Sequence, residues 1–437
     1  MPTVLVTGAA SGIGRATAVH FAAKGWQCLL VDRDGKALDA LVSKLPGRHH
    51  ALGIDLTDAA RVRSLGGAVI SAGPIDAVVN NAGMSDSSGT PLADQSPAQQ
   101  SSLALLNLDA PAAVVSAVDA RLAPGARVVN VSSGAGLRAI PFRGYYSASK
   151  AGLIAQTRAL ARARPDLGVT VLCPGFVRTE LVEGLIAAGR LDPRQAVAKT
   201  PLGRMADPAE MAEMIGFLAS PGAKAISGEV VALCGGSSVY GGTRACEPAT
   251  RAPLPMDLPT ALSVEAAGVD AWQGLAGEGI GAGCADGSGP QASRGTGAGE
   301  GRSPAAGRYQ AVIDASPLAA GGNPRDDRAA PDLVATVHEA AGRFASRHEA
   351  DASLTLLLPP DEAGDLPWQR AGEGAAARML VATLACELAS RALRVNAIEV
   401  APGLSAGELA PLLQFVAGAC AQFFTGQTLQ THRAQSA

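Results

Sequence analysis

The sequence has no excess of charge of either sign. Lysine and arginine number 36 and aspartate and glutamate 39, so the formal net charge is −3 over 437 residues. A nucleic-acid-binding surface needs clustered positive charge, and this balance argues against that class. No apolar run approaches the ~18 residues that a membrane-spanning helix needs. The chain moves at once into a strand pattern and a glycine-rich turn, so we expect no signal peptide and no membrane partner.

Cysteine is scattered rather than paired. Seven cysteines stand at positions 28, 173, 234, 246, 284, 386 and 420, with no C-x-x-C pair and no histidine cluster beside them. Disulfide frameworks and zinc sites need regular spacings of these residues, so the pattern argues against both. It fits a reducing compartment. We therefore expect a cytoplasmic protein without a bound metal.

The chain is longer than one ordinary domain, and its composition changes along its length. Residues 241–306 are rich in glycine, alanine, proline and serine. Such a composition buries too little apolar surface to offset the entropy of ordering. We therefore predict a first domain over 1–240, a flexible linker over 241–306 and a second domain over 307–437. Within the linker, 259–275 is expected to form a short docked helix, because Trp272 needs cover.

The first domain opens on a nucleotide-binding pattern. An apolar strand at 3–7 leads into the turn GAASGIG, and a helical pattern and a second strand ending at Asp32 follow. In such a unit the glycines let the backbone approach a pyrophosphate at the positive end of the helix. Asp32 is predicted to bind the adenosine ribose hydroxyls and to repel a 2′-phosphate, which favours NAD. Arg33 keeps NADP open, because an arginine there can receive that phosphate. The contacts predicted in the turn are Gly8, Ser11, Gly12, Ile13 and Gly14.

Strand and helix patterns then alternate through the first domain. Further strands are predicted within 49–58, 75–83, 125–133, 168–175 and 228–236. This alternation predicts an α/β fold, a doubly wound parallel sheet of the Rossmann-like type with right-handed crossovers. Asp55 and Leu56 follow a strand, where they border an adenine ring or simply form a turn.

One helical segment carries a candidate acid/base pair. Tyr146 and Lys150 lie four residues apart, and residues at i and i+4 share a helix face. The pKa of a free tyrosine is about 10, and an ammonium ~4 Å away contributes roughly 4 kcal/mol at an effective dielectric of ~20. Tyr146 with a lowered pKa is therefore a candidate general acid/base, with Ser133 placed to hold a substrate oxygen. Taken alone, such a pair is more often a solvated ion pair on a helix surface.

These motifs, in this order, resemble the classical short-chain dehydrogenases/reductases over residues 1–240. The matching stretches are Thr7-Gly8-x-x-x-Gly12-x-Gly14, Asn80-Asn81-Ala82-Gly83, Asn107, Ser133, Tyr146-x-x-x-Lys150 and Pro174-Gly175-x-Val177-x-Thr179. The resemblance implies that Asn107, Ser133, Tyr146 and Lys150 form the catalytic set, with Tyr146 as acid/base and Asn107 holding a water. It further implies that Lys150 binds the nicotinamide ribose and lowers the pKa of Tyr146. The remaining cofactor contacts it implies are Asn81, Ala82, Gly83, Pro174, Gly175, Val177 and Thr179.

The resemblance also places the substrate. Residues 176–204 would form a mobile lid, in which Leu181, Leu185 and Ile186 make an apolar stripe. The alternative is that this stripe packs on the sheet. Arg138 and Arg143 flank the loop before Tyr146, where they either receive an anionic substrate group or remain solvated.

The second domain resembles the latter half of another short-chain dehydrogenase, decayed. Strands are predicted within 308–317, 353–360 and 393–403, with helices over 332–347 and 374–391. Aligned by eye, Arg370 and Gly374 stand where Tyr146 and Lys150 stand in the first domain, so we expect a truncated Rossmann-like domain without cofactor or activity. Family dimers pack the corresponding helices together. The second domain is therefore expected to act as a built-in pseudo-partner, open to further homo-oligomerisation, unless it is a vestigial duplicate.

The predicted function is hydride transfer between NAD(H) and a secondary alcohol or ketone, with NADP less favoured. An alternative within the enzyme class is a 3-oxoacyl-thioester reductase or 3-hydroxyacyl-thioester dehydrogenase. An alternative of another class is a sensor or scaffold that binds NAD(H) without turnover.

Overall fold

The computed structural model contains two compact units. The described residues are 1–86, 90–138, 140, 143–242, 244–265, 272, 275, 277–280, 308–320, 333–360 and 372–433. The first unit comprises Met1–Pro193 and Met205–Cys234, and the second comprises Arg194–Arg204 and Gly235–Ala434. The chain therefore passes into the second unit for eleven residues, 194–204, before it completes the first.

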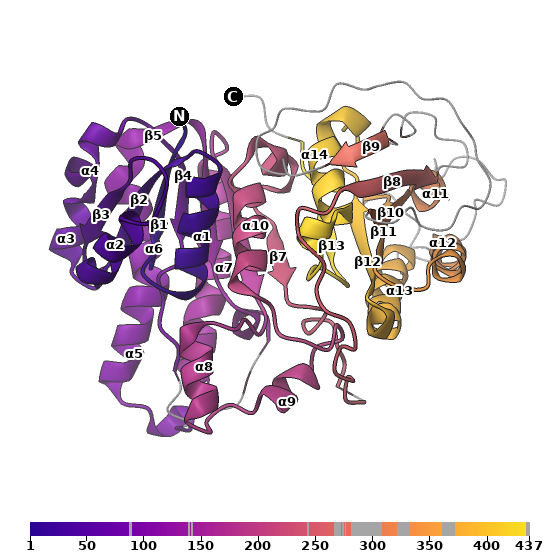
Figure 1. Cartoon of the computed structure of the whole chain (residues 1–437), viewed down its shortest axis with the longest axis horizontal. Helices are drawn as coiled ribbons and strands as arrows, with labels where there is room; N and C mark the ends of the chain where they lie inside the picture. Colours follow the sequence, from indigo (N-terminus) through magenta and orange to yellow (C-terminus); the bar gives the residue numbers. More distant parts are fainter. Residues whose placement is uncertain are drawn as a thin grey trace. The chain divides into compact units, whose positions relative to one another are not determined.

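The first unit is built on a seven-stranded sheet in the order β3-β2-β1-β4-β5-β6-β7 (Figure 1). All neighbouring strands run parallel. The strands are β1 Thr3–Thr7, β2 Gln27–Asp32, β3 His50–Gly53, β4 Ile75–Asn80, β5 Leu122–Val131, β6 Gly168–Pro174 and β7 Val230–Leu233. The chain order changes direction between β1 and β4, and the carboxyl ends of these strands form the crevice in which such sheets bind ligands. The predicted doubly wound parallel fold is confirmed.

Helices follow the strands and cover both faces of this sheet (Figure 1). They are α1 Gly12–Ala23, α2 Gly35–Val42, α3 Ala59–Arg63, α4 Leu65–Ala68, α5 Pro97–Ala104, α6 Ala110–Val118, α7 Gly144–Ala163, α8 Glu180–Ala187, α9 Pro193–Val197 and α10 Pro208–Leu218. Residues of α3, α4 and α6 join the strands in one hydrophobic core, and α1 packs against α10.

The helical stretch Pro97–Arg121 is, among the described residues, the one long and apolar enough to cross a membrane by length and composition. In this fold Ala110, Val114 and Val118 on it are buried in the core beside the sheet. Packing of a core helix therefore accounts for its apolar character. Between α5 and α6 the chain makes a π-helical turn, Leu105–Asp109, which contains the fully buried Asn107. Such turns often occur at functional sites.

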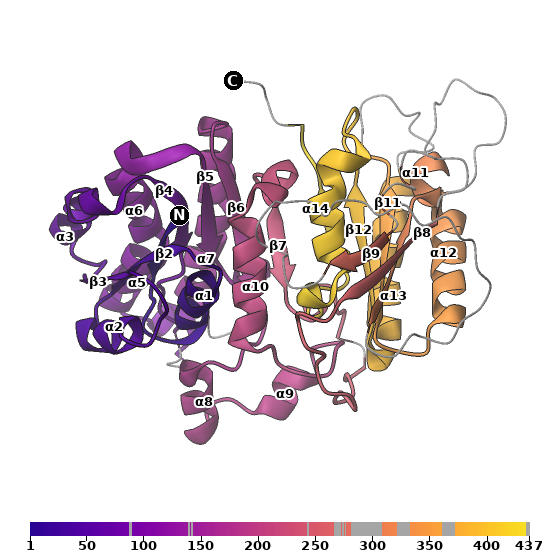
Figure 2. The same ribbon diagram turned by 45° about the horizontal axis from the view of Figure 1, so that its top comes forward.

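The second unit holds a six-stranded sheet in the order β13-β12-β11-β10-β8-β9. Its strands are β8 Thr260–Glu265, β9 Gly277–Ile280, β10 Tyr309–Asp314, β11 Ala352–Leu358, β12 Leu393–Glu399 and β13 Thr428–Gln430, and its helices are α11 Ser316–Ala320, α12 Leu333–Arg347, α13 Glu373–Leu388 and α14 Ala406–Ala417. All pairs are parallel except β8 with β9. Helices α12 and α13 cover one face and α14 the other (Figure 2). The second α/β fold is confirmed.

The expected helix within 259–275 is wrong for residues 260–265, and residues 266–271, 273 and 274 lie outside the described residues. Residues Thr260–Glu265 form strand β8, which pairs with β10 along its whole length. The reason is that the neighbouring edge of β10 needs a hydrogen-bonding partner, a demand that the local sequence does not reveal. Trp272 is buried, as expected. The predicted linker is therefore wrong for β8, and its stretch 281–306 lies outside the described residues.

Candidate active site

The glycine-rich turn after β1 packs directly on the chain that follows β4. Gly8 has a φ of +65°, and a Cβ there would lie 2.8 Å from the Cα of Ala82. A Cβ on Gly14 would lie 2.0 Å from the carbonyl oxygen of Gly8. The amide Nδ2 of Asn81 donates to the carbonyls of Thr7 (3.0 Å) and Gly8 (3.2 Å). The turn therefore tolerates only glycine here, and it leaves the first N–H groups of α1 facing the crevice.

The acid at the end of β2 is held at the edge of the same crevice. The carboxylate of Asp32 accepts hydrogen bonds from the backbone N–H groups of Ala10 and Asp34, each at 3.1 Å. Asp55 accepts from the hydroxyl (2.7 Å) and the N–H (2.9 Å) of Thr57, and these bonds lower the pKa of Asp55. The turn role that the sequence left open for Asp55 is thus present.

A cleft of about 450 Å³ joins these residues. Its lining contains most of the predicted cofactor contacts: Gly8, Ser11, Gly12, Ile13, Asp32, Arg33, Asp55, Leu56, Asn81, Ala82, Gly83 and Thr179. Sequence reasoning missed further lining residues, namely Ile54, Thr57, Met84, Leu106, Glu180 and Leu181. Most of these residues stand next to the predicted contacts Leu56, Gly83 and Thr179 in the sequence, and that adjacency could have identified them. Predicted contacts outside this lining are Gly14, Tyr146, Lys150, Pro174, Gly175 and Val177.

The tyrosine and serine of the predicted catalytic set meet. Ser133 follows β5 and Tyr146 lies near the start of α7, close enough for the Ser133 hydroxyl to affect the pKa of the Tyr146 phenol. Burial raises the pKa of Tyr146, and the Ser133 hydroxyl and the charge of Arg143 act against that rise. The predicted lowering of this pKa by Lys150 is therefore wrong for this structure.

Lys150 is hydrogen-bonded at the end of β5. Lys150 is 5% exposed, and its Nζ donates to the carbonyl oxygen of Val131 at the end of β5, 3.0 Å away. Burial lowers the pKa of Lys150 to about 8. The shared helix face does bring the lysine near the site, but the strand end provides its hydrogen-bond acceptor.

Asn107 is hydrogen-bonded both to the chain that follows β4 and to helix α7. Its Oδ1 accepts from the N–H of Met84 (2.9 Å), and its Nδ2 donates to the carbonyl of Met84 (3.0 Å) and to the hydroxyl of Ser149 (3.1 Å). Ser149 in turn donates to the carbonyl of Tyr146 at 2.9 Å. A Cβ on Gly83 would lie 3.0 Å from Oδ1 of Asn107 and 3.2 Å from Nζ of Lys150. Gly83 therefore stands where the predicted cofactor and catalytic residues converge.

The strand end after β6 leads into the predicted lid. A Cβ on Gly175 would lie 2.8 Å from the Cα of Cys234, and Val177 pairs with Ala206 in an isolated bridge. Thr179 caps α8 by accepting from the N–H of Val182 at 3.3 Å. None of the residues of α8, all of them described, is fully buried, and Leu181 is 59% exposed. Of the apolar stripe, Leu181 is therefore exposed, whereas Leu185 and Ile186 are half-buried.

The two arginines before Tyr146 differ in their surroundings. Arg143 donates through Nη1 to the hydroxyl of Ser85 (2.7 Å) and the carbonyl of Asp86 (2.5 Å). Arg138 is exposed. Among the described residues, no three His, Cys, Asp or Glu side chains gather in a way that could hold a metal ion.

The residues present fit a dinucleotide. Gly8 and Gly14 leave a cradle that any Cβ would fill, the N-terminus of α1 offers N–H donors to an anion, and Asp32 offers a carboxylate to ribose hydroxyls. The Ser133–Tyr146 pair lies at the ends of β5 and α7, beside strands of the same sheet. Fold and site together define the class of dinucleotide-binding α/β oxidoreductases.

Comparison with known proteins narrows this class. Residues 8–238 match the family model described as enoyl-(acyl carrier protein) reductase. The 3-oxoacyl-[acyl-carrier-protein] reductase FabG of Thermotoga maritima is 33% identical over 240 residues, covering 53% of this chain and 96% of that protein. D-threitol dehydrogenase of Mycolicibacterium smegmatis is 35% identical, covering 54% and 92% respectively.

Two further likenesses name the family directly. An uncharacterized short-chain type dehydrogenase/reductase of Sinorhizobium fredii is 39% identical over 53% of this chain, and the match spans 43% of that protein's length. A short-chain dehydrogenase/reductase (glucose/ribitol dehydrogenase) structure from Brucella melitensis superposes with a TM-score of 0.51 at 30% identity, covering 54% and 96% of the two chains. Through its N-terminal part, the chain belongs to the short-chain dehydrogenase/reductase family. Members of this family use nicotinamide cofactors.

Proposed function

We propose that the protein is an NAD(H)-dependent short-chain dehydrogenase or ketoreductase acting on a secondary alcohol or ketone. The observation that carries the proposal is the convergence of Asn107 and Lys150 at Gly83, which lines the cleft. The influence of the Ser133 hydroxyl on the Tyr146 phenol adds to it. Hydride transfer coupled to proton transfer needs three things: a phenol that exchanges a proton, a hydroxyl that holds the substrate oxygen and a cleft that binds the dinucleotide. Tyr146, Ser133 and the cleft are the proposed sources of these.

In this proposal the bound nicotinamide supplies or accepts the hydride, and the protein positions the reactants and moves the proton. Asp32 accepts hydrogen bonds from the adenosine ribose, and the N-terminus of α1 binds the diphosphate. Ser133 holds the substrate oxygen. Tyr146 takes the hydroxyl proton during oxidation, or returns it during reduction. The ammonium of Lys150 binds the nicotinamide ribose and contributes positive charge, while Asn107 holds a water in the proton relay. Pro174, Gly175, Val177 and Thr179 border the nicotinamide.

NAD is the proposed cofactor rather than NADP. The support is the carboxylate of Asp32, which is fixed by two backbone N–H groups at the edge of the cleft. A 2′-phosphate on the ribose would face this negative charge. Arg33 lines the same cleft and is the residue that would favour NADP.

A thioester substrate is the second proposal within the enzyme class. It is favoured by the likeness to 3-oxoacyl-[acyl-carrier-protein] reductase and to a putative ketoacyl reductase of monensin polyketide synthase, which is 35% identical over 252 residues. In this proposal the exposed Arg138 would receive the anionic carrier, since a guanidinium suits bidentate contacts with anions. A panel of steroid, sugar, aryl and acyl-thioester substrates with NADH and NADPH separates the possibilities. Preference for the thioester should fall when Arg138 is replaced by Gln.

The rival of another class is a sensor that binds NAD(H) without turnover. We expect Tyr146→Phe to lower turnover by roughly 10²–10⁴-fold, the usual contribution of a general acid/base, while the affinity for NADH stays unchanged. Tyr145→Phe, which removes a neighbouring phenol from the same helix, is the matched control and should keep activity. Steady-state rates and NADH fluorescence titrations provide the two readouts. If the wild type binds NADH but turns over none of the panel, the sensor is the better account.

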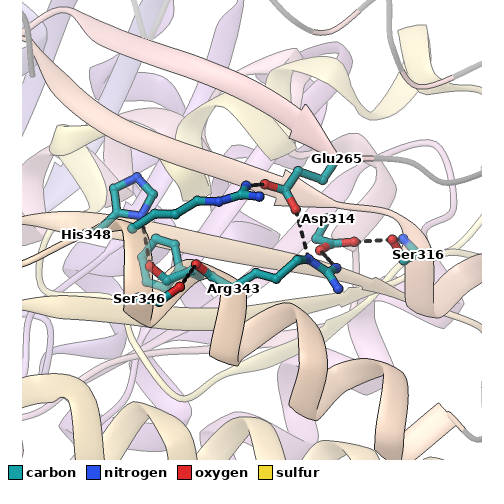
Figure 3. Close-up of polar contacts among 8 residues, drawn as sticks. Glu265, Asp314, Ser316, Arg343, Ser346 and His348 are labelled. Atoms are coloured by element: carbon teal, nitrogen blue, oxygen red, sulfur yellow. Dashed lines mark hydrogen bonds and ion pairs between the residues drawn. The ribbon is translucent and has the colours of Figure 1, made fainter. Parts of the chain in front are cut away.

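For the second unit we propose a degenerate short-chain dehydrogenase domain. Its strands β8-β10-β11-β12-β13 are arranged like β1-β4-β5-β6-β7 of the first unit. At the carboxyl ends of β8 and β10, where the first unit has its dinucleotide cleft, Glu265 and Asp314 lie side by side and pair with Arg343 at 3.3 and 2.8 Å (Figure 3). Arg347 also pairs with Glu265. Carboxylates at this position oppose a diphosphate.

We further propose that this unit is a built-in pseudo-partner, with α12 and α13 as counterparts of the family's dimer helices. Gly374 lies in α13, and Arg370 lies outside the described residues. Expression of residues 1–240 alone tests the proposal, and a soluble, fully active monomer would rule it out. The cytoplasm is the proposed compartment, since the six described cysteines are free thiols.

A further inference from the structure

A carboxylate of the predicted lid rests on the glycine-rich turn. Glu180 is the first residue of α8, and its Oε2 accepts the backbone N–H of Gly12 at 2.9 Å. Its other oxygen forms an ion pair with the guanidinium of Arg15. The neighbouring Thr179 comes within 3.3 Å of the position that a Cβ on Gly12 would take. The start of the lid is thus attached to the start of α1 by charge and by contact.

The atoms that hold Glu180 are those that a cofactor diphosphate would use. Gly12 begins a twelve-residue helix, and the N–H groups at such a helix start carry partial positive charge and bind anions. Glu180 lines the same cleft as Gly8, Asp32 and Asn81. Hydrogen bonds to backbone N–H groups, including that of Gly12, and the charge of Arg15 hold the pKa of Glu180 below its usual range. The lid therefore presents an ionised carboxylate to this anion site at neutral pH.

We propose that Glu180 is an internal competitor of the cofactor diphosphate and thereby determines the affinity and entry rate of NAD(H). The proposal rests on the proposed function of this cleft. Cofactor entry requires the carboxylate to leave Gly12 and Arg15, and the first turn of α8 moves with it. Release of Glu180 also frees Arg15 to approach the diphosphate. Cofactor binding and lid opening are in this way one coupled event.

The contacts of α8 suit such a release. Arg15 and Glu180 have side chains 49% and 50% exposed, so water can replace the ion pair at little cost. No residue of α8, which the structure describes throughout, is fully buried. Exposed ion pairs and helix-terminus charges of this kind correspond together to roughly a two- to tenfold effect on an equilibrium constant.

The test compares two acids of the same helix. Glu180→Gln removes the competing charge, whereas Glu183→Gln removes a charge from the same helix that pairs with Arg178 at 2.8 Å. We expect Glu180→Gln to tighten NADH binding roughly two- to tenfold, and Glu183→Gln to leave it unchanged. Fluorescence titration of the full chain measures the dissociation constant. Equal affinity in the wild type and Glu180→Gln, or equal tightening in both variants, overturns the proposal.

The kinetics give a second readout. A competitor must leave before the cofactor enters, so stopped-flow mixing with NADH should show the gain of Glu180→Gln in the association rate. Faster dissociation in that variant would mean that Glu180 holds the bound cofactor, which contradicts the proposal. Failure of the wild type itself to bind NADH would refute the proposed function instead. Melting curves of both variants, expected to match the wild type within a few degrees, show that each is folded.

Discussion

At the scale of single residues, burial governs the catalytic pair more than charge does. Tyr146 has a raised pKa and Lys150 a lowered one, and burial is the largest cause of each shift. Both shifts favour the neutral form, because a low-dielectric site disfavours either charge. The hydroxyl of Ser133 and the charge of Arg143 work against the shift at Tyr146. In the proposed mechanism a bound cofactor and substrate would have to complete the electrostatics of the site.

The lysine predicts a specific dependence of stability on pH. Its pKa is about 8 in the folded chain and 10.5 without the fold, so between these values the unfolded chain binds more protons. Stability contributed by this group therefore rises with pH across that window. From pH 8 to 9.5 we expect the wild type to gain roughly 1.5 kcal/mol relative to Lys150→Met. Urea unfolding of both proteins at the two pH values measures it, and a constant difference would contradict it.

The variant comparison is needed because other groups titrate at alkaline pH. Burial raises the pKa of Cys28 and of Cys173 to about 12. A raised thiol pKa acts in the opposite sense, because the unfolded thiols ionise first and stability falls as pH rises. Both proteins contain Cys28, so its contribution cancels in the difference. The charge of Lys150 acts on the pKa of Cys173, so the comparison is made no higher than ~pH 9.5, where a thiol with a pKa of about 12 stays protonated in the folded chain.

At the scale of elements, the glycine-rich turn is fixed by close packing rather than by flexibility. A Cβ on Gly14 would meet first the carbonyl oxygen of Gly8 and then, slightly farther away, the side-chain amide of Asn81. The strand end of β1, the turn and the chain after β4 are therefore one packed unit on which the dinucleotide cleft depends.

This packing predicts different outcomes for two glycine substitutions. In Gly14→Ala the new Cβ would lie 2.0 Å from the carbonyl oxygen of Gly8 and 2.5 Å from Nδ2 of Asn81. Overpacking of this kind costs roughly 1–3 kcal/mol, and we expect NADH affinity to fall more than ~10-fold as the turn shifts. Gly67→Ala is the control, since nothing lies within 4 Å of its Cβ position in α4. Thermal melts and NADH titrations of both variants provide the measurement, and equal behaviour of the two would refute the packing argument.

At the scale of the whole chain, part of the predicted lid belongs to the second unit. The lid, 176–204, starts in the first unit, its residues Arg194–Arg204 lie in the second, and the chain returns to the first at Met205. Within the second unit, the guanidinium of Arg204 lies 4.7 Å from the ring centroid of Phe423, and the carbonyl of Phe423 accepts from the N–H of Gly235 at 3.0 Å. The backbone N–H of Cys246 donates to the carbonyl of Ala198 at 2.9 Å. A segment expected to serve substrate binding is thus held by the C-terminal part of the chain.

Loss of the Phe423 ring should therefore change substrate binding. We expect Phe423→Ala to raise the Michaelis constant for the ketone several-fold, because the segment around Arg204 loses its packing, while NADH affinity stays unchanged. Phe344→Ala is the matched control. That ring is equally buried in the second unit but packs in the core of α12 and α13. Both substitutions should destabilise by roughly 3–5 kcal/mol, so measurements belong well below the melting temperature. Equal Michaelis constants in the two variants would show that the segment has no part in substrate binding.

The sequence by itself determined the parallel sheet of the first unit, the turn Gly8–Gly14 and the set of residues that meet at Gly83. The sheet and the turn follow from local properties, namely short apolar strands and glycines with special backbone needs, whereas the set of residues at Gly83 is what the family resemblance implied. In the second unit, strands β10, β11 and β12 and helices α12 and α13 also follow from such patterns.

Only the tertiary structure decided the rest. Strand β8 formed against expectation because it could pair with β10. Lys150 donates to Val131, and Glu180 reaches Gly12 across 168 residues of sequence. Each of these depends on which backbone group lies within hydrogen-bond distance after folding, and on how much water burial removes. Neither quantity is encoded in a local stretch of residues, because both are properties of segments brought together from distant parts of the chain.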